Sequence, residues 1–121
     1  MLKFNSILIG SDNPKQLGEF YGKVLNAKPG WENGGFIGYD AGGFYLMVGP
    51  HDKVHGSNTN PERLLINFEA ANFDEEFSRI KAVEGVSIVQ EPYHPDEAAK
   101  MSLATFADPD GNYFQLATPM A

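Results

Sequence analysis

The chain has 121 residues, the size of one domain or of two half-domains that share a core. Hydrophobic residues make up 42% of it, which is enough for a core and excludes a disordered chain. The net charge of −7 argues against a nucleic-acid partner, and the lack of cysteine excludes disulfides, zinc-thiolate sites and thiol catalysis.

The first half of the sequence predicts one strand, one helix and three more strands. LKFNSILIG suits a strand, and its apolar run ILIG is too short for a signal peptide or a membrane span, so we expect a soluble, cytoplasmic protein. Pro14 fits the first turn of a helix that Asp12 or Asn13 caps. Apolar residues then recur at helical spacing, namely Leu17, Phe20, Tyr21, Val24 and Leu25. Glycines divide the three strand-like runs that follow, around Trp31, in GGFIGYD and in GGFYLMVG.

The same order of elements begins again at about residue 63. RLLINFEA predicts a strand, and Asn72 with Glu75 predicts a capping box at the start of a helix. Phe73, Phe77 and Ile80 give that helix its apolar stripe, and Gly85 ends it. VSIVQEP predicts another strand, and MSLATFADPDGNYFQLATP predicts a closing hairpin.

The two halves therefore form a repeat of the pattern β-α-β-β-β. Residues 43–48 line up with residues 111–116, which places Met47 where Gln115 stands in the second copy. A repeat of this length indicates two copies of one supersecondary unit with a shared buried surface. We expect a single domain over 1–121, with module 1 at about 1–50, a polar linker at about 51–62 and module 2 at about 63–119.

In these features the chain resembles the glyoxalase / bleomycin-resistance / extradiol-dioxygenase group, the vicinal oxygen chelate superfamily. The resemblance is carried by Ser11-Asp12, Phe20-Tyr21 and Val24-Leu25 in the first half, and by Phe106 and Asp108-Pro109-Asp110-Gly111-Asn112 in the second. It implies an α+β fold in which two βαβββ modules form curled mixed β-sheets around an open cup. It also implies a homodimer, with modules paired within or between chains.

Metal-using members of this group place a divalent ion on four ligands, usually His and Glu, from the first and last strand of each module. The matching positions here are Asn5, Met47 (or Tyr45), Leu65 (or Arg63) and Gln115. Neutral amides do not hold Zn, Ni or Fe(II) against water, because these ions prefer imidazole or carboxylate. The sequence therefore predicts no metal ion and no cofactor.

Alternation along the predicted strands gives the floor of the cup. We expect it to be mostly apolar, with tyrosines and amides, and to suit a small, flat, weakly polar ligand held by a few hydrogen bonds. The alternative is a cup filled by its own side chains. Glu69 is either a general base or a carboxylate in water at the rim. The predicted ligand-binding residues are Asn5, Ile7, Tyr45, Met47, Leu65, Asn67, Glu69, Tyr113 and Gln115.

Two other groups of titratable residues stand out. His51 and His55 lie in HDKVH, between turn residues that favour a loop, and His94 lies in EPYHPDE. Loop histidines in water are the simpler interpretation, although any of the three could edge the cup. Asp108 and Asp110 have the pattern of a pair of catalytic carboxylates, but Asp-Pro-Asp-Gly is turn chemistry, and we interpret them so.

We predict a metal-independent small-molecule binding protein of the glyoxalase/bleomycin-resistance type, without nucleic-acid or membrane partners. The alternatives are a lyase, isomerase or dioxygenase of the same superfamily, with a displaced or absent metal site, and a structural or interaction role. Whether the chain is an enzyme stays open, and no catalytic residue is identified.

Overall fold

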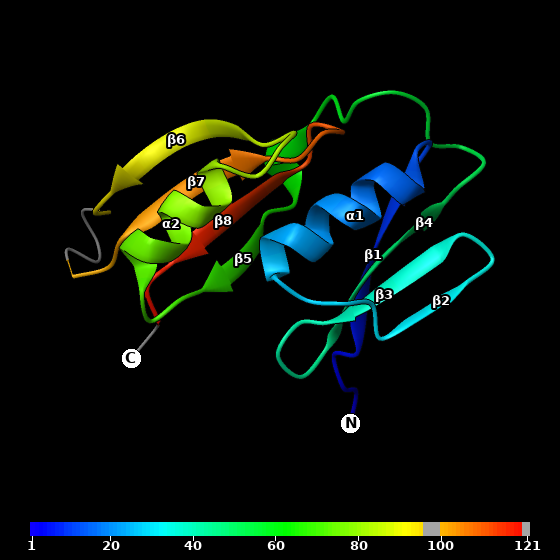
Figure 1. The fold of residues 1–121 in the computed structure, drawn as a ribbon, viewed down its shortest axis with the longest axis horizontal. Coiled ribbons are helices and arrows are strands. Elements are labelled where there is room, and N and C mark those ends of the chain that lie inside the picture. Colours follow the sequence, from blue (N-terminus) through cyan, green and yellow to red (C-terminus); the bar gives the residue numbers. More distant parts are fainter. Residues whose placement is uncertain (96–99, 120–121) are drawn as a thin grey trace. The chain divides into compact units, whose positions relative to one another are not determined.

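The computed structural model describes residues 1–95 and 100–119, and their contacts divide the chain into two compact units. Unit 1 is Met1–Gly56 and unit 2 is Ser57–Ala121, so the division falls inside the segment expected as a linker. Each unit contains one α-helix and one four-stranded mixed sheet (Figure 1). The predicted α+β fold with a repeated βαβββ order is confirmed.

Unit 1 has its strands in the order β1-β4-β3-β2. Strand β1 runs parallel to β4, and the other neighbours are antiparallel. The elements are β1 (Ser6–Ser11), α1 (Pro14–Leu25), β2 (Trp31–Asn33), β3 (Phe36–Asp40) and β4 (Tyr45–Pro50).

Helix α1 packs closely on one face of this sheet. The buried residues of the predicted apolar stripe are Leu17, Phe20, Tyr21 and Val24. Tyr39 on β3 donates a hydrogen bond of 2.7 Å from its hydroxyl to the backbone oxygen of Gly18. A Cβ on Gly22 would lie 2.6 Å from the same hydroxyl oxygen, so the approach of helix and strand depends on glycine here.

The helix starts differ from the prediction. Asn13 and Asn72 occupy the N-cap positions, but neither side chain makes a capping hydrogen bond. The predicted capping box of Asn72 and Glu75 is therefore wrong. At α1 the buried Ser11 accepts a hydrogen bond of 3.0 Å from the backbone N–H of Asn13 instead, which fixes the chain as it leaves β1.

Unit 2 repeats the topology, with its strands in the order β5-β8-β7-β6. The strand observed within RLLINFEA is shorter than predicted and covers only Ile66–Glu69, and residues 61–63 before it form a 3-10 helix. The elements are η1 (Pro61–Arg63), β5 (Ile66–Glu69), α2 (Phe73–Lys81), β6 (Ser87–Tyr93), β7 (Leu103–Ala107) and β8 (Tyr113–Ala117).

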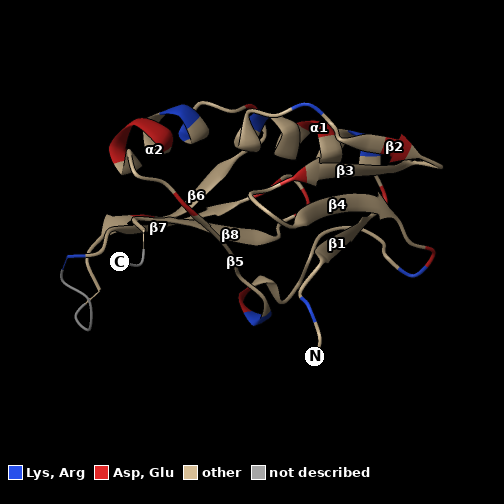
Figure 2. Ribbon diagram, turned by 90° about the horizontal axis from the view of Figure 1, so that it is seen from below, with Lys and Arg blue, Asp and Glu red and all other residues tan. Residues whose placement is uncertain are grey.

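Aromatic rings join α2 to its sheet. The Phe77 ring lies 5.4 Å from that of Phe106, which lies 5.3 Å from that of Phe114. The helix carries acidic residues in its first turn and basic ones in its last (Figure 2), an order that suits the helix dipole. None of the helices in the described residues is long and apolar enough to cross a membrane.

The turn between β7 and β8 is organised by Asp108, which is 4% exposed. Its Oδ1 accepts hydrogen bonds from the backbone N–H groups of Asp110 and Asn112, and its Oδ2 accepts one from Nδ2 of Asn112. Gly111 follows with a φ of 83°, which favours glycine. The interpretation of Asp108 as a turn residue is confirmed.

Candidate functional site

Each sheet has one face under its helix and one face without a helix, which we call the uncovered face. In unit 1, Leu46 and Val48 of β4 are buried on the face that α1 covers, together with Tyr39. Ile7 and Ile9 are their Cα partners on β1, so they share the covered face. Ile7, which was expected to line the cup, therefore lies on the face that α1 covers and not on the uncovered face.

The uncovered face of unit 1 has an apolar row at its centre. The register places Leu8 beside Met47, Met47 beside Gly38, and Gly38 beside Trp31, one residue from each of the four strands. A Cβ on Gly38 would lie 2.5 Å from Nε1 of Trp31, so the indole packs in the space that a side chain would fill. Leu8 is 50% exposed and Trp31 is 37% exposed.

The uncovered face of unit 2 has a row of polar residues at the equivalent place. Asn67, Gln115, Thr105 and Gln90 are successive Cα partners on β5, β8, β7 and β6. Met47 and Gln115 occupy corresponding positions in the two rows, as the repeat in the sequence predicts. We call these sets the apolar row and the polar row.

One hydrogen bond joins two members of the polar row. Gln115 donates from Nε2 to Oγ1 of Thr105 over 3.0 Å. Thr105 is 7% exposed, so the bond satisfies a nearly buried hydroxyl. This bond gives a structural reason for an amide in a strand that is otherwise built for burial.

Of the other predicted ligand-binding residues, some lie on the uncovered faces and others lie outside the strands. Tyr45 shares the uncovered face of unit 1 with Met47, and Tyr113, Asn67 and Glu69 share that of unit 2 with Gln115. Asn5 and Leu65 lie outside the strands, each just before one. Leu8, Trp31, Thr105 and Gln90 belong to the rows but were missed by sequence reasoning, because alternation does not tell which residues lie opposite one another.

The three histidines lie in exposed loops. A Cβ on Gly10 would lie 3.3 Å from Cβ of His51, so His51 packs at the end of β1. Its Nδ1 accepts a hydrogen bond from the backbone N–H of Lys53. Asp52 lies 3.4 Å from the same nitrogen, but a nitrogen that accepts carries no proton for an ion pair. His94 donates from Nδ1 to the backbone oxygen of Met101.

The residues at the expected metal positions do not fit a divalent transition metal. They offer two amides, a thioether and a leucine, and the amide of Gln115 already bonds to Thr105. Within residues 1–95 and 100–119, no three His, Asp or Glu side chains gather where they could share an ion. No step of any reaction is therefore assigned to a metal.

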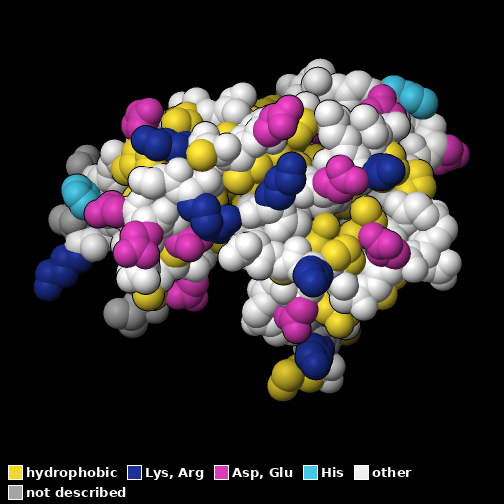
Figure 3. All heavy atoms as spheres, in the orientation of Figure 1, with side chains coloured by type: hydrophobic (Ala, Val, Ile, Leu, Met, Phe, Trp, Pro, Cys, Tyr) yellow, Lys and Arg dark blue, Asp and Glu magenta, His cyan; other side chains and the backbone are white. Residues whose placement is uncertain are grey.

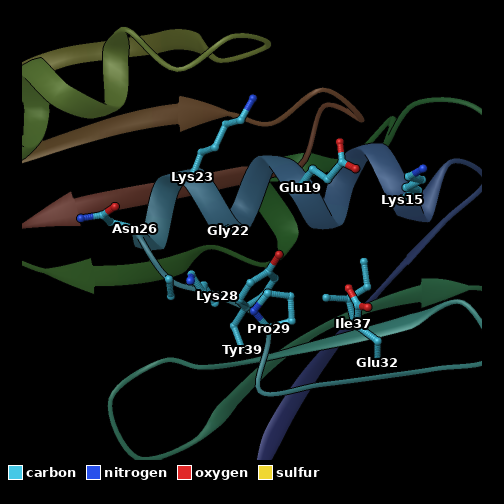
Figure 4. A pocket seen from close by; sticks show the side chains of 11 residues that line it. Lys15, Glu19, Gly22, Lys23, Asn26, Lys28, Pro29, Glu32, Ile37 and Tyr39 are labelled. Carbon is cyan, nitrogen blue, oxygen red and sulfur yellow. The ribbon is translucent and has the colours of Figure 1, made fainter.

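A groove lies elsewhere in unit 1, along the flank of α1 (Figure 4). One part has a volume of about 520 Å³ and is bordered by Lys15, Glu19 and Lys23 of α1 and by Glu32, Ile37 and Tyr39 of the sheet. A second part of about 420 Å³ shares Lys15, Glu32 and Ile37. The groove exists because one helix cannot cover all four strands. Its charges alternate in sign, as they do across the face in Figure 3, so it favours no one class of ligand.

The fold is that of the class of α+β proteins built from two βαβββ modules. The chain belongs to the glyoxalase/bleomycin resistance protein/dioxygenase superfamily, whose family model matches residues 3–116. Among curated proteins, none matches the sequence significantly.

Solved structures show the same fold at low identity. A glyoxalase-related enzyme from Fulvimarina pelagi is 20% identical with a TM-score of 0.78, covering 98% of this chain and 89% of that one. A lactoylglutathione lyase from Agrobacterium tumefaciens is 15% identical with a TM-score of 0.72, covering 96% and 92%. A fosfomycin resistance protein from Mesorhizobium loti is 16% identical with a TM-score of 0.67, covering 99% and 92%. These similarities establish the fold alone.

Proposed function

We propose that the protein binds a small organic molecule on its uncovered sheet faces without a metal ion. The observation that carries the proposal is the hydrogen bond from Gln115 to Thr105, at the position where the superfamily pattern places a metal-binding carboxylate. The amide keeps a polar group on the face, but it lacks the charge with which a carboxylate holds a divalent ion.

The apolar row supports the same proposal. Leu8 and Trp31 are exposed and Met47 is partly exposed, so they offer apolar and aromatic surface beside Gly38, which has no side chain. A thioether and an indole adapt well to flat organic molecules. In unit 2, the polar row offers a few hydrogen-bonding groups of the kind that small-molecule sites use.

Metal content tests the first half of the proposal. Purified protein is expected to contain no stoichiometric Zn, Ni, Fe or Mn by elemental analysis, and Ni²⁺ is expected to leave its melting temperature unchanged. Asn67 and Gln115 are Cα partners, so Asn67→His with Gln115→Glu puts an imidazole and a carboxylate side by side. This double variant is expected to gain stability in Ni²⁺, which shows that the assay detects a site. One tightly bound ion per wild-type chain would refute the proposal.

Fragment binding tests the second half. A small set of neutral aromatic fragments is added to ¹⁵N-labelled full-length protein, while the fluorescence of Trp31, the only tryptophan, is recorded in parallel. Binding is expected to shift the signals of the two rows and to change the emission. Lys28→Ala, in the groove beside α1, is the control that leaves these responses unchanged. Shifts confined to the residues of that groove would contradict the proposal.

Enzymatic activity as a lyase, isomerase or dioxygenase is the competing function. The position of His51 at the end of β1 favours it, because this is a titratable side chain next to Gly10, which shares the uncovered face with Leu8. If His51 is a general base, His51→Ala abolishes turnover of the ligand identified by fragment screening and leaves its binding intact. If the protein only binds, wild type and variant leave the ligand unchanged over hours.

We also propose that the protein is a cytoplasmic homodimer. Phe4 and Leu64, which are 69% and 66% exposed, lie just before β1 and β5 and offer apolar surface to a second copy. Sedimentation is expected to give twice the chain mass of 13.3 kDa, and Phe4→Ser with Leu64→Ser is expected to shift the equilibrium to monomer. A wild-type monomer at high concentration would contradict the dimer.

A further inference from the structure

The polar row offers hydrogen bonds on a sheet that has no positive charge. Strands β5, β6, β7 and β8 contain no Lys or Arg, and their charged residues are Glu69 and Glu91. A carboxylate or phosphate on this face would lose water without gaining a counter-charge, which is costly. The face therefore disfavours anionic ligands.

Two carboxamides lie next to each other in this row. Asn67 and Gln115 are Cα partners on neighbouring parallel strands. Gln115 commits its Nε2 to Thr105, whereas the exposed side chain of Asn67 makes no hydrogen bond within the described part of the chain. Asn67 thus presents both a C=O acceptor and an N–H donor.

A carboxamide holds its donor and acceptor in one plane at a fixed spacing. A ring with N–H next to C=O presents the complementary pair along one edge, so the two edges form two parallel hydrogen bonds. Asparagine and glutamine recognise the edge of adenine by the same geometry. This arrangement selects by the order of donor and acceptor and needs no charge.

An aromatic side chain and two alanines lie beside the two amides. Tyr113 lies two residues before Gln115 on β8, on the same face and about 7 Å along the strand. Its Cα partner is Ala107, and Ala117 lies two residues after Gln115. Both alanines are buried, whereas the partly exposed tyrosine offers an aromatic surface for stacking.

We propose that the polar row binds a neutral, planar heterocycle that carries N–H next to C=O, a lactam or a cyclic imide. This inference rests on the proposed function and names the ligand class for the polar half of its surface. It gives a role to the exposed carboxamide of Asn67, which makes no hydrogen bond within the described part of the chain.

Three probes of similar shape test the class. Uracil has the lactam edge, 1,3-dimethyluracil lacks its N–H groups, and orotate adds a carboxylate. Each is titrated into ¹⁵N-labelled full-length protein, and the side-chain NH₂ signals of Asn67 and Gln115 are followed. Uracil is expected to saturate these shifts with a Kd of about a millimolar, as suits so small a ligand. The other two are expected to bind at least about tenfold more weakly.

Two variants connect the preference to Asn67. Asn67→Leu removes both polar groups, and Asn67→Asp keeps the size but loses the N–H donor. Each is expected to lower the affinity for uracil to that for 1,3-dimethyluracil, while Lys28→Ala keeps the wild-type preference. Because Asn67 is exposed, the backbone spectra of both variants are expected to stay close to wild type. A variant whose spectrum shows that it is folded, but which still prefers uracil as the wild type does, would overturn the role of Asn67.

The outcomes separate this inference from the proposed function. If 1,3-dimethyluracil or orotate shifts the polar row as strongly as uracil, the lactam class is wrong, but the face still binds small molecules. If uracil and neutral fragments shift only the signals of the apolar row, the polar row is not the recognition element. This inference then fails, while the proposed function stands. If no probe or fragment shifts either row, both proposals fail.

Discussion

The side chain of Gln115 on β8 is tied to that of Thr105 on β7 by a hydrogen bond of 3.0 Å between Nε2 and Oγ1. The two residues are Cα partners at the centre of the sheet in unit 2. A glutamate at this position would accept a hydrogen bond from the threonine and carry a charge. The amide instead donates, and its remaining groups stay available on the uncovered face.

A double-mutant cycle measures this bond. Thr105→Val and Gln115→Leu each remove one partner, and the coupling between them is expected to be about 0.5–1 kcal/mol in urea unfolding. Gln90 is also a Cα partner of Thr105, but its Nε2 bonds to the backbone oxygen of Glu91. The cycle of Gln90→Leu with Thr105→Val is therefore expected to be additive. Equal coupling in both cycles would show that packing, not the hydrogen bond, links Gln115 to Thr105.

Asp108 is expected to matter for stability and not for chemistry. Asp108→Ala removes the acceptor of two backbone N–H groups and of Nδ2 of Asn112, at a cost of about 2–3 kcal/mol in the free energy of unfolding. Asp108→Asn keeps an acceptor for the backbone groups and is expected to cost less. Ligand binding at a temperature where all three proteins are folded is expected to be unchanged. Loss of binding without loss of stability would contradict the structural role.

The sequence is informative about the repeat and about the turn of Asp108, because both depend on local patterns. Glycine and proline punctuate the strands, and Asp-Pro-Asp-Gly specifies a tight turn wherever it occurs. The correspondence of Met47 with Gln115 follows from the repeat alone. These features allowed the fold, Met47 and Gln115 to be predicted, and alternation along RLLINFEA added Asn67.

Other features depend on the register between strands, which a single sequence does not encode locally. The continuous apolar run Ile7-Leu8-Ile9 has no alternation, so nothing in it tells which residues face α1. Pairing with Met47 shows that Leu8 lies on the uncovered face. Thr105 and Gln90 join the polar row only through pairing across three strands, and their sequence positions gave no sign of it.

Gly38 is expected to hold Trp31 in place by lacking a side chain. A Cβ there would lie 2.5 Å from Nε1 and 2.7 Å from Cε2 of the indole, so Gly38→Ala is expected to displace the ring into water. The expected results are a red shift of the emission and a stability loss of about 1–2 kcal/mol. Gly30→Ala is the matched control, because its Cβ would meet no atom closer than 3.6 Å. A similar red shift in both variants would show that backbone stiffening, not contact, moves the indole.

The hydroxyl of Tyr39 is expected to make the protein sensitive to base. The residue is 2% exposed and donates to the backbone oxygen of Gly18. Burial first, and then the charges of Glu32 and Glu19, raise the pKa of Tyr39 above its ordinary value of 10.0. The folded state therefore keeps this proton to a higher pH than the unfolded state does. The stability that the neutral hydroxyl contributes is complete below about pH 10 and is lost as the pH rises through the folded pKa.

Tyr39→Phe isolates this contribution. Without the hydrogen bond the variant is expected to be about 1 kcal/mol less stable than wild type between pH 7 and 9. As the pH rises above 10, wild type loses stability through Tyr39 and the variant does not, so the two urea-unfolding curves are expected to converge. Tyr45→Phe, at a tyrosine that is 37% exposed, controls for the loss of a tyrosine hydroxyl elsewhere in unit 1. A gap between wild type and Tyr39→Phe that stays constant to pH 11 would mean that the hydroxyl contributes its hydrogen bond but that its proton is not linked to folding.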